Sequence, residues 1–333
     1  MKTLKAGVIG LGHLGKEHAR LYHELPNAEL TALCDTDLEK SERAKAFGLD
    51  LTTDYRKILH TVDLVSIVTP TSTHYEIAKA ALERGVHVLI EKPMTYEVGE
   101  ADELIKLAKE KNLTLKVGHL ERYNAGYLRV QQLAHDIRFI EIHRLGPFNP
   151  RINDCGVVLD LMIHDLDLVL QLVKSEIASI DAIGVNVLTP YEDIANVRMK
   201  FENKAIADLT ASRLTPEAQR KIRIFQEDAY ISLDYVAQSA QIYRRASFPQ
   251  ALFSATQRGG SVIFSGGGGK ISREQITVEK EEPLRAELED FVRSVGRGTS
   301  HGKPDVQARD ALCLAHRILA SIQENAPTPA HAV

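Results

Sequence analysis

The sequence predicts an α/β fold that combines a doubly wound parallel sheet with a C-terminal α/β domain whose sheet is open and largely antiparallel. Short strand-like runs alternate with helical patterns from residue 4 to about residue 118. After about residue 120, strand-like runs follow one another with few helical patterns between them. Strands alternating with helices are typical of parallel sheets, and consecutive short strands are typical of antiparallel ones.

The N-terminal part contains five strand-like runs separated by helical patterns. The runs span residues 4–10, 29–34, 63–69, 86–91 and 113–118, and the helical patterns span residues 14–24, 37–47, 75–84 and 97–111. Residues Thr36–Glu39 read TDLE, a capping-box sequence that predicts a helix capped by Thr36. Gly85 lies where a glycine ends a helix. A sheet of this kind binds its ligand at the carboxyl ends of its strands.

The C-terminal part begins with an apolar helix pattern and ends with two amphipathic helices. The first pattern covers residues 159–173, and strand-like runs cover residues 177–188, 194–203, 204–213, 220–235 and 240–245. Residues 246–283 are rich in Ser, Gly and Gln, which predicts a long loop or an irregular hairpin. We expect domains at residues 1–122 and 123–333, with the final helices able to pack back on the first domain.

Composition excludes several classes of protein. The chain has 333 residues, of which 44% are hydrophobic and 26% charged, so it is globular and long enough for two domains. A net charge of -4 without long like-charge runs argues against nucleic acid or a membrane as partner. Three widely separated cysteines predict reduced thiols in the cytoplasm, with Cys34 in the core. We expect no signal peptide, no membrane span and no metal site.

Three glycines follow the first strand in the GxGxxG spacing, at residues Gly10, Gly12 and Gly15. In a dinucleotide site they allow a tight turn, close approach to a pyrophosphate and close packing of helix on strand. Asp35 ends the second strand, where a carboxylate can bond the ribose hydroxyls of NAD and repel the extra phosphate of NADP. The alternative is that Asp35 caps a helix. Because Thr36 is expected to fill that role, the cofactor interpretation is favoured, with NAD rather than NADP.

The sequence Glu91-Lys92-Pro93 ends another strand at the same edge. A lysine there can donate a hydrogen bond to a substrate hydroxyl, and Pro93 can aim it, through a cis bond if one forms. The alternative is a surface salt bridge between Glu91 and Lys92, which the motif taken alone favours.

The apolar pattern at residues 159–173 carries an unusual set of ionisable groups. In a regular helix, Asp160, His164 and Asp167 fall within about 60° of one another, and Asp165 points elsewhere. Burying such groups without partners costs several kcal/mol. Either they form a satisfied buried network, or the polar stripe faces a wet cavity where something binds.

Four ordered motifs resemble the Gfo/Idh/MocA family, over essentially the whole chain. They are GxGxxGxxH at residues 10–18, TPTSTH at 69–74, EKP at 91–93 and DxxxHxxD at 160–167. The resemblance implies an N-terminal Rossmann domain that binds NAD, and a C-terminal domain often used for oligomerisation, here as a homodimer or homotetramer. It implies that Lys92, Asp160 and His164 are catalytic. The implied cofactor contacts are Gly10, Gly12, His13, Leu14, Gly15, Asp35, Thr69, Pro70, His74, Glu91 and Lys92.

The chemistry of these groups fits that implication. His164 is the expected general base because the ordinary pKa of histidine, about 6.5, lies close to neutral pH. Asp160 would hold the imidazole or a neighbouring hydroxyl, and Lys92 would stabilise a developing alkoxide. Asp167 is expected to anchor the helix. His18 and His74 match family positions near the cofactor, or serve as helix-terminal hydrogen bonders.

Two further stretches bear on the substrate. GHLERYN at residues 118–124 and DLMIHDLD at 160–167 resemble the branch that oxidises the 3-hydroxyl of UDP-N-acetylhexosamines. Met162 stands where family members often have glycine, which narrows the space beside the pocket and argues against inositol or glucose. The expected substrate contacts are Lys92, Arg122, Tyr123, Asn124, Asp160 and His164, with Arg144 or Arg151 on a diphosphate.

Three classes of function remain open. The first is an NAD-dependent dehydrogenase of a nucleotide sugar, or else of a free sugar or polyol. The second is a glycosidase of the same fold that uses NAD transiently. The third is a cofactor-binding sensor with a decayed site, against which the intact Lys92, Asp160 and His164 argue.

Overall fold

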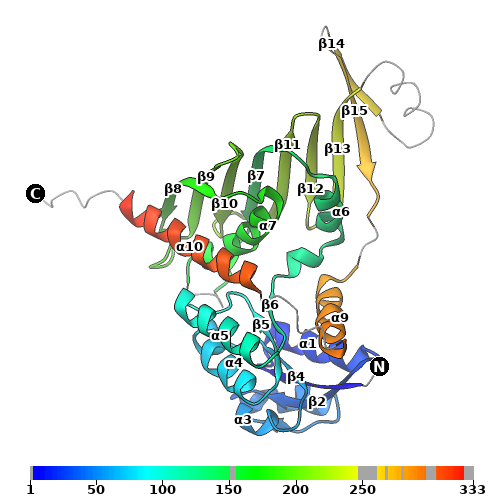
Figure 1. Ribbon diagram of the computed structural model, residues 1–333, viewed down its shortest axis with the longest axis vertical. Coiled ribbons are helices and arrows are strands. Elements are labelled where there is room, and N and C mark those ends of the chain that lie inside the picture. Colours follow the sequence, from blue (N-terminus) through cyan, green and yellow to red (C-terminus); the bar gives the residue numbers. More distant parts are fainter. Residues whose placement is uncertain are drawn as a thin grey trace, which may run out of the picture. The chain divides into compact units, whose positions relative to one another are not determined.

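The computed structural model describes residues 3–150, 155–246, 261–266, 269–278, 281–297 and 305–325. The chain forms two compact units (Figure 1). The first contains the residues up to Leu120 together with Glu282–Cys313, and the second contains Glu121–Glu281 and the residues from Leu314. The division into domains at residues 1–122 and 123–333 stays a prediction.

The first unit is built on a six-stranded parallel sheet with the order β3-β2-β1-β4-β5-β6. Its strands are β1 (Leu4–Ile9), β2 (Ala28–Cys34), β3 (Leu51–Thr52), β4 (Leu64–Ile67), β5 (His87–Glu91) and β6 (Leu115–Gly118). The order reverses between β1 and β4, and a doubly wound sheet binds its ligand beyond the strand ends at such a point. The predicted doubly wound sheet is therefore confirmed. The short strand β3 carried no signal in the sequence.

Helices connect these strands. They are α1 (His13–Glu24), α2 (Ser41–Lys45), α3 (Tyr55–Ile58), α4 (His74–Glu83) and α5 (Val98–Glu110), with 3-10 turns η1 (Leu38–Lys40) and η2 (Thr71–Thr73). A further helix of this unit, α9 (Pro283–Gly296), comes from near the end of the chain. The expected capping box at Thr36 is wrong. The chain turns one residue later, so that Asp37 caps η1 by accepting a hydrogen bond from the N–H of Glu39 at 3.0 Å. Gly85, at φ +80°, follows α4 as predicted.

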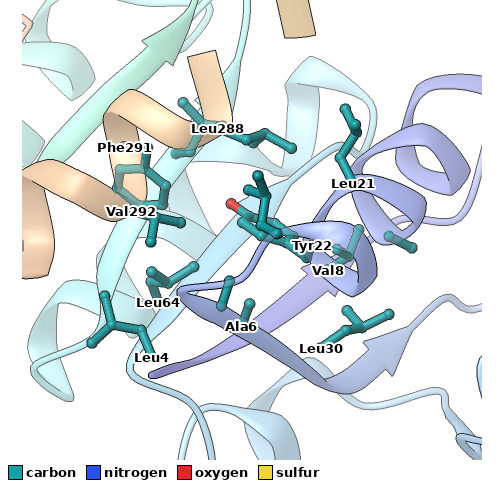
Figure 2. Close-up of a cluster of buried hydrophobic side chains, with 14 of the residues drawn as sticks. Leu4, Ala6, Val8, Leu21, Tyr22, Leu30, Leu64, Leu288, Phe291 and Val292 are labelled. Atoms are coloured by element: carbon teal, nitrogen blue, oxygen red, sulfur yellow. The ribbon is translucent and has the colours of Figure 1, made fainter. Parts of the chain in front are cut away.

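A buried hydrophobic cluster joins α1 and α9 to the sheet (Figure 2). In this cluster Leu288, Phe291 and Val292 of α9 lie among side chains of α1, β1 and β4. The buried residues of α9 recur every three or four positions, which is the pattern of a helix with one apolar face. Full burial of a side chain such as Phe291 stabilises a fold by about 1.5–3 kcal/mol. A helix from the end of the chain therefore completes the core of the first unit.

The second unit is built on a nine-stranded sheet with the order β14-β15-β13-β12-β11-β7-β10-β9-β8. Its strands are β7 (Ile137–Leu145), β8 (Ile177–Val185), β9 (Ile194–Phe201), β10 (Ile206–Ser212), β11 (Gln219–Gln226), β12 (Ala229–Asp234), β13 (Ser239–Ala246), β14 (Ser261–Gly266) and β15 (Gly269–Ile276). The pair β7–β10 is parallel and the other recorded pairs are antiparallel. The predicted open, largely antiparallel sheet is confirmed.

Two details of this sheet bear on the sequence analysis. Strand β7, inside the sheet, was not anticipated. The pairing of β14 with β15 has a register shift between Val262 and Phe264, so these residues form the irregular hairpin that was one of two expectations for residues 246–283. Residues 247–260, 267–268 and 279–280 of that stretch lie outside the described part of the chain.

Helices pack against one face of the nine-stranded sheet (Figure 1). They are α6 (Ala125–Leu133), α7 (Ile163–Val173) and the end of α10 (Val306–Glu324), where the Oγ of Ser321 accepts a hydrogen bond from the N–H of Ala182 at 3.2 Å. Along β9 and β11, buried residues alternate with exposed ones, as expected for a sheet with one covered face. Across the described ranges, we find no helix with the length and apolarity that a membrane crossing requires.

Candidate functional site

The loop after β1 has the geometry of a dinucleotide-binding turn. Gly10 has φ +95°, and a Cβ there would lie 2.3 Å from the carbonyl oxygen of Val68. A Cβ on Gly15 would lie 1.8 Å from the carbonyl oxygen of Gly10, so glycine is required for α1 to approach β1. A Cβ on Gly12 would meet nothing within 4 Å. Two glycines are thus needed for packing, and the third leaves open space over the helix end.

The N-terminus of α1 suits an anionic ligand. The cap residue is Gly12, which has no side chain to accept a hydrogen bond from the first N–H groups of the helix. No acidic residue lies in the first turn. The first N–H groups of a helix lack partners within the helix and carry partial positive charge. Pyrophosphate binds well at such a helix end. His13 and Leu14, predicted cofactor contacts, are exposed in this turn.

Asp35 lies next to this loop, at the end of β2. Its carboxylate accepts hydrogen bonds from the N–H of Leu11 at 2.6 Å and of Asp37 at 2.9 Å, and from Nζ of Lys40 at 2.9 and 3.0 Å. Burial raises the pKa of Asp35, but these donors outweigh burial and hold that pKa below its ordinary value. Asp35 is therefore an anion tied to the glycine loop. It does not cap η1, and its predicted contact with a ribose stays a prediction.

The EKP segment is held by a buried contact between His18 and Glu91. Nε2 of His18 lies 3.3 Å from Oε1 of Glu91, and Oε2 of Glu91 accepts the N–H of Lys92 at 3.3 Å. Burial raises the pKa of Glu91, but His18 and Lys92 lower it further, so that the carboxyl group is ionised near neutral pH. The Lys92–Pro93 bond is cis, as one expectation had it. Glu91, predicted to contact the cofactor, is buried beneath the strand end.

His74 holds two strand ends together. Its Nδ1 lies 2.9 Å from the carbonyl oxygen of Pro93, and its Nε2 lies 2.9 Å from that of Thr69. Burial lowers the pKa of His74 below its ordinary value in spite of these acceptors. A neutral ring donates to one of the two carbonyls at a time. His74 thus positions Thr69 and Lys92 relative to one another, while Thr69 and Pro70 themselves lie at the carboxyl end of β4.

In the second unit, the segment with Asp160 and His164 is not a regular helix. Residues Val158–Met162 (η4) form a π-helical turn, and α7 begins at Ile163. The assumption of 100° per residue is therefore wrong across Asp160, because a π turn is wider than an α turn. Such turns are frequent at functional sites. Asp160 is buried, His164 is half-buried, and Met162 is fully buried in the core.

The carboxylate of Asp165 is neutralised by an arginine. Nε and Nη2 of Arg144 donate to Asp165 at 2.8 and 2.7 Å, and Nη1 donates to Glu121 at 3.0 Å. Burial disfavours the charged guanidinium, but the two carboxylates outweigh it and raise the pKa of Arg144 above its ordinary value. Arg144 is only 4% exposed. The expectation that Arg144 meets a diphosphate is wrong, because buried carboxylates already bind its guanidinium. Arg151 lies outside the described residues.

Asp167 is bound in the same way. Nε and Nη2 of Arg122 donate to it at 2.7 and 2.5 Å, and Nε2 of Gln171 donates at 3.0 Å. This ion pair anchors the helix, as expected for Asp167, and it gives Arg122 a structural partner beside its predicted substrate contact. Asn124 caps α6 by accepting the N–H groups of Gly126 and Tyr127 at 3.0 and 3.3 Å. Tyr123 is half-buried in η3 (Leu120–Tyr123). The substrate roles of Arg122, Tyr123 and Asn124 stay predictions.

Two acidic residues that the sequence analysis missed hold the start of this segment. Oε1 of Glu192 accepts the N–H of Val158 at 3.1 Å, and the carbonyl of Glu192 accepts the N–H of Val157 at 3.0 Å. A Cβ on Gly156 would lie 2.0 Å from the Glu192 carboxylate, so a side chain there would require this carboxylate to move. No motif could reveal this contact, because Glu192 approaches only after the sheet has formed.

Asp193 organises the loop that carries Glu192. It accepts the N–H groups of Val187, Leu188 and Thr189 at 2.7, 2.6 and 3.0 Å, and Nε of Arg213 at 2.7 Å. Arg213 also donates to the carbonyl of Cys155 at 3.1 Å. Burial would raise the pKa of Asp193, but these donors hold it well below its usual range. The cluster ties the loop to the chain entering η4.

The comparisons with known proteins agree with this geometry. A family model described as an oxidoreductase family with an NAD-binding Rossmann fold matches residues 4–119. A second model, described as the GFO/IDH/MocA C-terminal domain, matches residues 136–232. The UDP-N-acetylglucosamine 3-dehydrogenase of Acidithiobacillus ferrooxidans is 36% identical over 328 residues, which are 97% of this chain and 98% of that protein.

Solved structures share the fold. A structure of UDP-N-acetylglucosamine 3-dehydrogenase from Acidithiobacillus ferrooxidans is similar at a TM-score of 0.84 and 34% identity, covering 97% of this chain and 99% of that one. The scyllo-inositol dehydrogenase of Lactobacillus casei, solved with NAD(H) and scyllo-inositol, is similar at a TM-score of 0.76 and 22% identity, covering 97% and 98% of the two chains.

Substitution of the glycines should separate packing from cofactor binding. Gly15→Ala places a Cβ against the carbonyl of Gly10, and we expect it to lower the free energy of unfolding by about 1–3 kcal/mol or more. The new methyl group of Gly12→Ala has open space, so the free energy of unfolding should stay unchanged. NADH binding should weaken about tenfold, because the methyl group occupies the space where the backbone approaches the pyrophosphate. Thermal unfolding and NADH titration would measure both. Equal loss of stability in the two variants would contradict the assignment.

Removal of the Asp193 carboxylate should destabilise the second unit. Asp193→Ala leaves a buried arginine and three N–H groups without their acceptor, and we expect a loss of about 3–5 kcal/mol at neutral pH. Because the pKa of Asp193 is depressed in the fold, its contribution is present above the unfolded pKa of about 3.9 and is lost as the pH falls further. Asp208→Ala, which breaks an exposed pair with Arg198, should cost under about 1 kcal/mol. Urea unfolding at several pH values would test both.

Proposed function

This chain belongs to the Gfo/Idh/MocA family of NAD-binding oxidoreductases, and from that premise we propose that it oxidises the 3-hydroxyl of a UDP-N-acetylhexosamine. The observation that carries the proposal is the match along 97% of the chain to a UDP-N-acetylglucosamine 3-dehydrogenase at 36% identity. The GHLERYN and DLMIHDLD stretches support the same branch. The residues of the first unit fit NAD: a glycine loop with open space at Gly12, an uncapped helix end and an ionised Asp35.

Lys92, Asp160 and His164 are the proposed catalytic groups. His164 accepts the proton of the sugar hydroxyl, and Lys92 donates a hydrogen bond to the oxygen as negative charge develops on it. Asp160 orients the imidazole or the neighbouring hydroxyl. Bound NAD supplies the acceptor for the electron pair that leaves the carbon. The proposal requires Lys92 of the first unit and His164 of the second to reach the same substrate oxygen.

Several side chains serve this chemistry without touching the substrate. Glu91 and His74 hold the backbone around Lys92, while Glu192 caps the segment that carries Asp160. Arg122 and Arg144 neutralise Asp167 and Asp165, so we assign these two carboxylates structural roles. Positioning of this kind matters because small displacements of catalytic groups reduce rates strongly.

The substrate is tested by NADH formation. Purified protein with NAD would be given UDP-N-acetylglucosamine, UDP-N-acetylgalactosamine, UDP-glucose, free N-acetylglucosamine and inositols, with oxidised products analysed by mass spectrometry. We expect NADH only with the UDP-N-acetylhexosamines. NADH from an inositol or free sugar alone would overturn the nucleotide-sugar proposal. Release of an aglycone from a glycoside without net NADH would instead favour the glycosidase alternative.

We also propose a homodimer or homotetramer formed through the face of the nine-stranded sheet that lies opposite α6 and α7. Four rings lie side by side across this face, with centroid separations of 5.6 Å (Phe139–Phe225), 4.7 Å (Phe225–Tyr230) and 5.1 Å (Tyr230–Tyr243). Phe225 is 37% exposed. Exposed aromatic clusters are typical of interfaces. Light scattering should give a mass above one chain, and a monomer at micromolar concentration would contradict the proposal.

The proposed compartment is the cytoplasm. Cys34, Cys155 and Cys313 form no disulfide, and burial raises the pKa of Cys34 to about 12, which makes it an inert core thiol. Cell fractionation followed by immunodetection would test this, and recovery outside the cytoplasm would contradict it.

Replacement of His164 tests the catalytic assignment. We expect His164→Ala to lower kcat about 100-fold or more, because the hydroxyl proton loses its acceptor, while NADH affinity stays nearly unchanged. The matched control is His135→Ala, which removes an exposed histidine of the same unit and should leave kcat unchanged. Full turnover in His164→Ala would remove this residue from the role of base.

A further inference from the structure

The carboxylate of Asp35 has its hydrogen-bonding capacity filled within the protein. Each of its two oxygens accepts one backbone N–H, from Leu11 on Oδ2 and from Asp37 on Oδ1. Each oxygen also lies within 3.0 Å of Nζ of Lys40. An ionised carboxylate offers about four acceptor positions. Ribose hydroxyls that bind Asp35 must therefore replace Lys40 as hydrogen-bond donors to its carboxylate.

Lys40 is the donor able to yield. The N–H groups of Leu11 and Asp37 belong to the glycine loop and to the turn after β2, so the backbone fixes them. The Lys40 side chain is 26% exposed, lies on the short turn η1, and is also 3.7 Å from Asp37. It can leave Asp35 and remain close by, since four rotatable bonds carry its ammonium.

A cationic side chain therefore lies beside the expected ribose position, where Lys40 is paired with Asp35 and lies 3.7 Å from Asp37. Dinucleotide-binding folds accept the 2′-hydroxyl on an acidic residue at this position and accommodate the 2′-phosphate with a nearby cation. This chain holds both: Asp35 and, directly on it, Lys40. Arg43 adds a second cation, since its Nη1 donates to the carbonyl of Leu11 in the glycine loop.

We propose that Lys40 is a cofactor-specificity residue: by offsetting the charge of Asp35 and pairing with a 2′-phosphate, it lets this protein bind NADP as well as NAD. NAD displaces Lys40 from Asp35 and takes its place. NADP keeps the ammonium at the site as the partner of its phosphate. The inference concerns cofactor binding alone and does not depend on which sugar the enzyme oxidises.

Binding measurements without any sugar test the proposal. Dissociation constants for NADH and NADPH, and for AMP and adenosine 2′,5′-bisphosphate, would be measured by calorimetry for wild type, Lys40→Met and Lys40→Arg. We expect wild type to bind both cofactors. In Lys40→Met the ratio of the NADPH to the NADH dissociation constant should rise about fivefold, the effect of a partly exposed ion pair. Two effects should contribute: weaker NADPH binding, because the phosphate loses its partner, and tighter NADH binding, because no ammonium has to leave Asp35. Lys40→Arg should restore the wild-type ratio.

The matched control is Lys45→Met, which removes a lysine from the neighbouring helix α2. Lys45 pairs with Glu42 at 2.7 Å and is 63% exposed, so it resembles Lys40 as an ion pair but does not touch Asp35. We expect the ratio of the NADPH to the NADH dissociation constant in Lys45→Met to equal that of wild type. The same rise in Lys45→Met would show a general effect of net charge and would overturn the proposal.

A double-mutant cycle isolates the charge pairing. Asp35→Ser removes the anion that repels a phosphate, so NADPH should bind more tightly than NADH. The preference of Asp35→Ser for NADPH over NADH should be lost in the Asp35→Ser, Lys40→Met double variant. The same preference should become smaller at high salt. An unchanged ratio in Lys40→Met, or no detectable NADPH binding to wild type, would overturn the proposal. Equal loss of both cofactors together with a lower melting temperature would assign Lys40 a structural role instead.

Discussion

Each ionised group that this protein buries has to find a compensating charge or a set of N–H donors, and this constraint organises both units. Removing a carboxylate from water costs several kcal/mol unless partners replace the lost hydration. Asp35 and Asp193 meet the requirement mainly with backbone N–H groups, and Asp165 and Asp167 meet it with bidentate arginines. In each case the partner ties a loop or helix to another part of the fold.

The same constraint builds the functional segments. The loops at the ends of β1, β4 and β5 are positioned by Asp35, His74 and Glu91, so the groups expected to contact NAD rest on buried polar contacts within the first unit. In the second unit the arginine pairs and Glu192 hold the segment with Asp160 and His164. The residues that perform the proposed chemistry are therefore few, and the residues that hold them in place are many.

The family comparisons and the geometry carry different parts of the conclusion. The matches establish an oxidoreductase with an NAD-binding Rossmann domain. The structure adds the reason Gly10 and Gly15 are needed for packing, and it identifies the arginine partners of Asp165 and Asp167. Neither the family matches nor the sequence motifs point to Lys40, because it belongs to no motif. Its contact with Asp35 is seen only in the folded structure.

Local patterns in the sequence were sufficient for the strand and helix alternation, the three glycines, Asp35, Gly85 and the amphipathic helix α9. These features depend on residues close together in the chain, where propensity and spacing act directly. The signals were too weak for the short β3 and α3 and for β7, which pairs only once distant strands are present.

Tertiary structure alone decided which partners the buried charges take. Arg122 is 45 positions from Asp167, Arg144 is 21 from Asp165, and Asp193 is 20 from Arg213. No spacing rule connects such pairs, because their distance in space is set by how strands and helices pack. For the same reason the helix at residues 159–173 read as regular, whereas the folded chain widens its first turn around Asp160. Along residues 159–173 the sequence indicated that charged groups lie in an apolar helix, and packing determined which partners neutralise Asp165 and Asp167.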